Sequence, residues 1–240
     1  MKRSFVRKFR QFGVAYAIGI LSATPASAGF FNEKIVKACP QAELEKQQFL
    51  AKRPQPKPVA NITRSALQTE LLQMAREDQA VREPFIAAIN AHGGDLPMDD
   101  PTRLAAIHVD KVNLTKLKHI INQDGFPTTA MVGLDGVAAA FLLTTHADYD
   151  SSFQAKILKI ITPRLRKNEI DGNQYALLTD RVLVAQGKQQ RYGTQFEGLG
   201  DQMRPKPIQD EAHVDERRRA LGLISIKNYT CVLHAVYDPQ

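Results

Sequence analysis

The stretch that decides the fold is RSALQTELLQMAREDQAVREPFIAAIN, residues 64–90. Its apolar residues recur at three- and four-residue spacing, at Leu67, Leu71, Met74, Val81, Phe85 and Ala88. This period predicts one long amphipathic helix that packs a single face on a core. Gly93 and Gly94 follow two residues later and are expected to end the helix.

The chain on both sides of this helix is also mainly helical in pattern. We predict further helices over residues 40–50, 99–125, 136–147, 150–168, 173–187 and 210–222, with Pro163 kinking or ending one of them. Only residues 128–133 and 228–237 favour strands, the second because apolar and other residues alternate along it. The expected fold class is mainly α: a multi-helix globular domain with at most a small β element near the C-terminus.

Polar residues interrupt the apolar stripe of the long helix. Asp78 stands on the stripe, Gln79 lies beside it, and Arg82 is one turn further on, within reach of Asp78. A charged pair on a core-facing surface is informative because charged residues are seldom buried. It can serve a binding site, or it can be a structural ion pair that orients two helices.

Two other apolar helices carry polar groups as well. Asp180 and Arg181 lie in the middle of the helix at 173–187, and His146 ends the helix at 136–147. Buried charges persist only when they are paired and hydrogen-bonded. We therefore expect one shared cluster of Asp78, Arg82, His146, Asp180 and Arg181.

The segment GKQQRYGTQF, residues 187–196, follows that helix directly. It supplies Gln190, Tyr192, Gly193, Thr194 and Gln195, which we expect to form a lid or wall of the cluster and to contact a polar ligand. The alternative is a solvated turn whose side chains cap helix ends. Arg218, in the charged run DERRRA, is a further residue that can turn inward toward the ligand.

The first 28 residues predict a secretory signal peptide. Five basic residues and no acid precede an apolar run of twelve, and Ala26-Ser27-Ala28 matches a cleavage site. Without this leader the formal net charge falls from +7 to about +2, which argues against a nucleic-acid partner. We divide the chain into a signal peptide (1–28), an N-terminal segment (29–50), a proline-rich linker (51–61) and one helical domain (62–240). The mature protein is expected to be exported, periplasmic or extracellular, with no stable membrane span.

Cys39 and Cys231 are the two cysteines of the chain. An even pair in an oxidising compartment favours a disulfide, which here would join the two ends of the mature chain. Two unpaired thiols are the alternative.

No motif in the sequence names a reaction. The run HADYD offers His146, Asp148 and Asp150, but at a helix-to-loop junction these need not converge on a metal, and Asp148 or Asp150 fits equally well as the cap of the next helix. The serine-hydrolase elbow, the zinc-protease motif, the phosphate-binding loop and the dinucleotide fingerprint are all missing from the sequence. We predict no cofactor and no bound metal.

An ordered set of motifs resembles a bacterial family known only as a domain of unknown function. The motifs, from about residue 66 to 229, are DQAVR (78–82), HVDKVN (108–113), GFP (125–127), HAD (146–148) with Gln154, DRV (180–182), QRYGTQ (190–195) and VDERR (214–218). The resemblance implies that these segments belong to one domain. It implies no reaction.

The leading functional expectation is a buried polar pocket that binds a small polar ligand or a cell-envelope fragment, held by Arg82, Arg181 and Gln195. One alternative is a hydrolase with His146 as general base, tuned by Asp180 or Asp78. The other is a structural or interaction protein in which the polar cluster only orders the helices. Neither the ligand nor the oligomeric state follows from the sequence.

Overall fold

The computed structural model describes residues 33–52, 61–165, 170–198 and 200–237. The predicted signal peptide and most of the proline-rich linker lie outside these ranges. The described chain is mainly α, as predicted. Its helices are α2 (Glu33–Ala38), α3 (Pro40–Lys52), α4 (Ser65–Ala91), α5 (Pro101–Asp124), α6 (Thr129–Thr145), α7 (Ser151–Leu165), α8 (Gly172–Ala185), α9 (Val214–Ala220) and α10 (Ile226–Tyr237).

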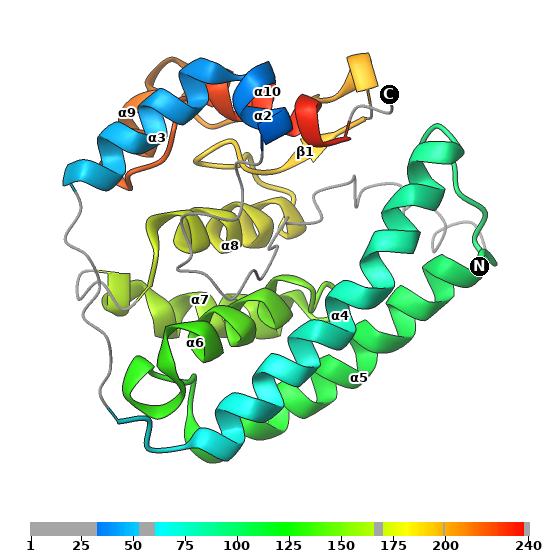
Figure 1. Ribbon diagram of the computed structural model, residues 1–240, viewed down its shortest axis with the longest axis vertical. Coiled ribbons are helices and arrows are strands. Elements are labelled where there is room, and N and C mark those ends of the chain that lie inside the picture. The colour runs from blue at the N-terminus through cyan, green and yellow to red at the C-terminus, as the bar shows by residue number, and fades with distance from the viewer. Residues whose placement is uncertain (1–32, 53–60, 166–169, 199, 238–240) are drawn as a thin grey trace.

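The long helix expected at residues 64–90 is α4, and it forms a hairpin with α5 (Figure 1). α5 begins as the sequence predicts: the Asp100 side chain accepts hydrogen bonds from the backbone N–H groups of Thr102 and Arg103, and Pro101 opens the helix. At the other end of the hairpin, the exposed Arg64 pairs with Asp124, with 2.7 Å between Nη1 and Oδ1. This ion pair links the start of α4 to the end of α5 and so holds the open end of the hairpin together.

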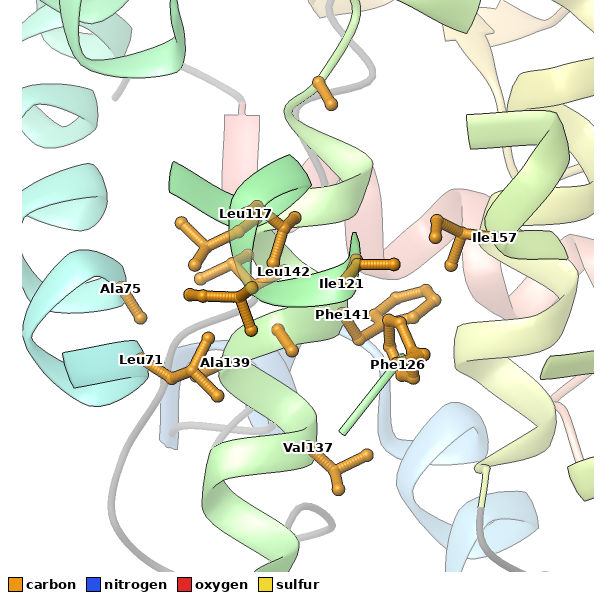
Figure 2. Packing of buried hydrophobic residues seen from close by; sticks show 14 of the residues in the cluster. Leu71, Ala75, Leu117, Ile121, Phe126, Val137, Ala139, Phe141, Leu142 and Ile157 are labelled. Atoms are coloured by element: carbon orange, nitrogen blue, oxygen red, sulfur yellow. The ribbon is translucent and has the colours of Figure 1, made fainter. Parts of the chain in front are cut away.

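Helix α6 runs through the centre of the core. Figure 2 shows Leu71 and Ala75 of α4 on one side of it and Ile157 of α7 on the other, with Leu117 of α5 close by. Almost every residue in the second half of α6 is buried, so this part of the helix has no solvent-facing side. Its sequence is accordingly apolar on all faces. The polar residue that follows it, His146, is thus delivered directly into the interior.

The two ends of the described chain meet at one end of the molecule (Figure 1). α2 and α3 pack against α10, and Cys39 and Cys231 form a disulfide, as predicted. Glu45 of α3 strengthens the contact, because its Oε2 accepts hydrogen bonds from Ser225 and Asn228. In the chain-entropy model, a loop this long gives the disulfide about 5 kcal/mol of stabilisation.

Both predicted strands are wrong. Residues 128–133 form the start of α6, where the Thr128 side chain caps the helix by accepting from Met131 N–H, and Gly133, at φ 71°, introduces a kink. Residues 228–237 belong to α10. The residues that alternated along it also include Tyr229, Leu233 and Tyr237, four apart, and it is this helical spacing that packs against the core.

The β structure of the described residues is a two-residue antiparallel pair, β1 (Phe196–Glu197) with β2 (Arg204–Pro205), and an isolated bridge between Gln190 and Ile208. The 3₁₀ turn η1 (Gly200–Gln202) lies between the two strands, and η2 (Glu211–His213) leads into α9. Within the described ranges, no helix combines the length and the apolar character that crossing a bilayer requires.

Candidate functional site

The site is built around Arg82 of α4. Asp78 and Arg82 are one helical turn apart on the buried face, and both are almost fully buried. Arg82 donates from Nη2 to Asp78 Oδ1 at 3.0 Å and from Nε to Asp78 Oδ2 at 3.2 Å, as the spacing predicts. Gln79 donates to the same carboxylate at 2.8 Å. The guanidinium is thus clamped to its own helix and directed toward α5 and α6.

Asp110 of α5 is the second carboxylate of the site, and it was missed as a site residue. Arg82 Nη2 donates to Asp110 Oδ1 as well as to Asp78. The signal was present in the sequence: Asp110 and Asn113 stand on the buried stripe of α5, just as Asp78 stands on that of α4. The same search for polar residues on an apolar stripe, when it is applied to α5, identifies Asp110 and Asn113.

His146 completes the group from the C-terminal end of α6. Its Nδ1 lies 2.9 Å from each carboxylate oxygen of Asp78 and 3.0 Å from Arg82 Nε. One nitrogen cannot serve both neighbours, because Nδ1 either gives its proton to Asp78 or accepts one from Arg82. We call Asp78, Arg82, Asp110 and His146 the Arg82 network.

Burial dominates the electrostatics of this network. Burial raises the pKa of Asp110 to about 7, helped by the charges of Asp78 and Asp148 and opposed by Arg82. Burial would also raise the pKa of Asp78, but contacts with His146, Arg82 and Gln79 hold it below its ordinary value. Burial and then the charge of Arg82 lower the pKa of His146, so the imidazole is neutral near pH 7.

A second ion pair adjoins the network. Arg181 Nη1 of α8 donates to both carboxylate oxygens of Asp148, at 2.8 and 2.7 Å. Gln154 of α7 donates to Asp148 Oδ1 at 3.0 Å and to the last carbonyls of α6. Asp148 follows His146 by two residues, and the pair acts on the charges of the network: Arg181 lowers the pKa of His146, and Asp148 raises that of Asp110.

Asp180, next to Arg181, belongs to a different structure. Its carboxylate accepts hydrogen bonds from the backbone N–H groups of Arg191, Tyr192 and Thr194 and from the Thr194 hydroxyl, at 2.7 to 3.2 Å. The carboxylate that contacts His146 is Asp78, so the expectation that Asp180 tunes His146 lacks the contact it needs. Asp180 anchors the loop at 190–195 instead.

The rest of that loop is held by its own contacts. Gln190, fully buried, donates to the carbonyls of Gln195 and Lys206 and accepts from Gln195 N–H at 2.8 Å. Gln195 donates to the Thr194 hydroxyl at 3.2 Å. Gly193 has a φ of 72° and fits between Ile208 and Ile226. The polar side chains expected to face a ligand are directed into the loop.

Arg218 does turn inward, and it completes this anchor. It is almost fully buried and donates to the backbone carbonyls of Tyr192 and Ile224, both at 2.6 Å, while its guanidinium lies over the Tyr229 ring. Burial raises the pKa of Tyr229 to about 12. We call Asp180, the loop 190–195 and Arg218 the Asp180 anchor.

The run HADYD spreads its three candidate ligands over different partners. His146 contacts Asp78, Asp148 pairs with Arg181, and Asp150 binds Lys118 Nζ at 2.6 Å. Asp150 also accepts from Phe153 N–H at 2.9 Å and so caps α7, which was one of the two positions left open for the cap. Gln154, in the first turn of α7, points inward to Asp148.

Comparison with known families bears out the resemblance. A family model described as a family of unknown function, DUF6624, matches residues 65–239. Neither the curated proteins nor the solved structures contain a match to the chain.

Proposed function

The chain belongs to the DUF6624 family, whose function is unknown, and we propose that it is an exported protein whose polar site binds a small polar ligand or a cell-envelope fragment. The site consists of the Arg82 network together with the pair of Asp148 and Arg181. The ligand approaches at the turn between α6 and α7.

Two features support export. The first 28 residues have the charge, apolar run and cleavage pattern of a secretory leader. The disulfide between Cys39 and Cys231 suits an oxidising compartment such as the bacterial periplasm.

One observation carries the ligand site: the ion pair of Asp148 and Arg181 beside the buried network is partly open to solvent. The side chain of Asp78 is fully buried and that of Asp110 nearly so, whereas the side chain of Asp148 is 26% exposed. Beside it Tyr149 is 42% exposed, with the ammonium of Lys111 over its ring at 5.2 Å. A ligand at this turn would meet charged groups on one side and an aromatic face on the other, which is the composition of sites for polar molecules.

Arg181 is the residue that we assign to the ligand. Its guanidinium is anchored by Asp148 at the exposed edge of the site, and a planar guanidinium presents several fixed donors to carboxylate or hydroxyl oxygens. Arg82 and Gln195, the other residues expected to hold the ligand, lie deeper, in the network and in the Asp180 anchor respectively.

The test is a thermal-shift screen of the protein, expressed with its own leader and purified from the exported fraction. Cell-wall fragments, sugars, amino acids and nucleotides are added in the presence of a chelator. Since a ligand of the folded state raises the melting temperature in a concentration-dependent way, a binding compound identifies the ligand class. The shift should vanish in Arg181→Met and persist in Arg64→Met, which removes an exposed guanidinium paired in the same manner.

The structural alternative predicts the opposite result. If the network only orders the helices, no compound shifts the melting temperature, and Arg181→Met unfolds because Asp148 is left without its partner. That pair of results would overturn the proposal.

A further inference from the structure

The guanidinium of Arg82 occupies the centre of a small set of metal-binding atoms. Its Nε and Nη2 atoms contact Asp78, Asp110 and His146, and each of these side chains offers an atom that binds metals. Among the described residues, the ligand atoms of these three side chains all lie within 4.8 Å of one another. The arginine thus supplies a positive charge where three separate helices bring two carboxylates and an imidazole together.

The spacing of these atoms suits a metal ion. With metal–ligand bonds of about 2.0–2.2 Å, neighbouring ligand atoms lie roughly 3–3.5 Å apart and opposite ones somewhat more than 4 Å. His146 Nδ1 is already 2.9 Å from Asp78, so the movement needed to close the set on an ion lies mainly on the Asp110 side, where the ligand atoms are within 4.8 Å. Gln79, which donates to Asp78 Oδ2 at 2.8 Å, would orient the carboxylate from outside the ligand set.

Asn113 is a second, independent sign of a ligand. It is 3% exposed, and its Nδ2 atom has no hydrogen-bond partner among the residues that the structure describes. It stands one turn after Asp110 on the same face of α5. Helical side chains lean toward the N-terminus of their helix, so the amide lies over the turn that carries Asp110. A buried amide there is suited to hold a water molecule or another group bound to an ion.

We propose that Asp78, Asp110 and His146 bind a divalent transition metal of the Zn²⁺ type, which takes the place of the Arg82 guanidinium. One imidazole nitrogen and two carboxylate oxygens form a donor set that Zn²⁺ accepts, and three protein ligands leave a coordination position open. The metal and the guanidinium use the same atoms, so their binding is mutually exclusive. The sequence run HADYD shares only His146 with this set, which is why its spacing did not predict the site.

This inference goes deeper into the site of the proposed function, and it rests on that site being a binding site. The two proposals fail separately. If Zn²⁺ binds and no envelope compound does, the metal site is supported and the proposal of an organic ligand is wrong. If a compound raises the melting temperature under chelation and Zn²⁺ does not bind, the metal site falls.

The experiment is a calorimetric titration of chelator-stripped protein with Zn²⁺, and separately with Mn²⁺. We expect one metal ion per chain. Asp110→Asn should weaken binding by about tenfold or more, because an amide oxygen is a poorer ligand than a carboxylate. Asp124→Asn is the matched control, since it makes the same change further along α5 in an exposed ion pair, and it should bind like the wild type. Absence of binding by the wild type, or equal binding by Asp110→Asn, overturns the proposal.

Arg82→Met tests the competition between the two cations. Without metal this variant leaves two carboxylates without their cation, so its melting temperature should fall, and Zn²⁺ should raise it by more than in the wild type. If the variant does not fold under chelation, Arg82→Lys makes the same comparison, because one ammonium cannot reproduce both nitrogen contacts. An equal or smaller rise with Zn²⁺ contradicts the exchange of guanidinium for metal.

Discussion

The Arg82 network and the Asp180 anchor are two buried polar structures with opposite construction. In the Asp180 anchor, a single carboxylate accepts from three backbone N–H groups and one hydroxyl of one loop. In the Arg82 network, charged side chains from α4 and α5 meet the imidazole at the end of α6. Asp180 thus meets neutral donors of a loop that follows it closely in the chain, whereas the network joins opposite charges that lie far apart in the chain.

This difference separates a structural role from a functional one. Neutral backbone donors around a carboxylate satisfy groups that would otherwise be buried without partners, so the anchor stabilises the loop. A network of buried charges stabilises little relative to apolar packing. Its carboxylate Asp110, with a pKa raised to about 7, is the kind of perturbed group that is frequent in functional sites. We therefore expect substitutions in the anchor to act on stability alone, and substitutions in the network to act on binding as well as on stability.

The largest expected effect is that of Asp180→Ala. It leaves the buried backbone N–H groups of Tyr192 and Thr194, the part-buried one of Arg191 and the Thr194 hydroxyl without an acceptor, at about 1–3 kcal/mol for each buried group, so the free energy of unfolding should fall by about 4 kcal/mol. Asp148→Ala, which removes a more exposed carboxylate, should cost about 1 kcal/mol. Urea unfolding followed by circular dichroism measures both. Equal losses in the two variants would erase the distinction between the anchor and the ion pair that adjoins the network.

A second, smaller effect is the pH dependence of stability in the chelated protein. The folded-state pKa of Asp110 is raised to about 7 from 3.8, so the folded state binds the extra proton between these values. This contribution to stability should therefore fall as pH rises from about 4 to 7, with a slope of at most about 1.4 kcal/mol per pH unit, while the lowered pKa of His146 gives a contribution of opposite sign below 6.5. Asp110→Asn removes only the first of these, so the free energy of unfolding of the wild type minus that of Asp110→Asn should fall over this range. A difference that stays constant or rises contradicts the assignment.

The sequence predicted the helical architecture and three of the four residues of the Arg82 network, with Asp110 missed. The long helices followed from apolar spacing, and the pair of Asp78 and Arg82 followed from polar residues on an apolar stripe. The alternating pattern of residues 228–237 misled, because residues four apart also satisfy an alternation of two.

The hydrogen-bond partners of Asp180 could not be predicted from the sequence. Adjacent residues of an α-helix point about 100° apart, so Asp180 and Arg181 face different neighbours although they adjoin in the chain. Asp180 faces the loop and Arg181 faces Asp148. Which of the two joins His146 depends on how α8 is rotated against α6 and α7, and this rotation is set by packing in three dimensions.

The smallest expected effect distinguishes two roles for the loop at 190–195: part of the Asp180 anchor, or a wall of the ligand site. Gly193→Ala places a Cβ at φ 72°, which costs about 1–2 kcal/mol, and this atom would lie 2.6 Å from Ile226 Cδ1. Gly187 has the same φ and open space around its Cβ position, so Gly187→Ala measures the backbone strain alone. If the loop is part of the anchor, Gly193→Ala is the less stable of the two in urea unfolding, and both variants bind metal and ligand like the wild type. Gly193→Ala could instead abolish ligand binding with no greater loss of stability than Gly187→Ala. In that case the loop is a wall of the ligand site and belongs with the Arg82 network.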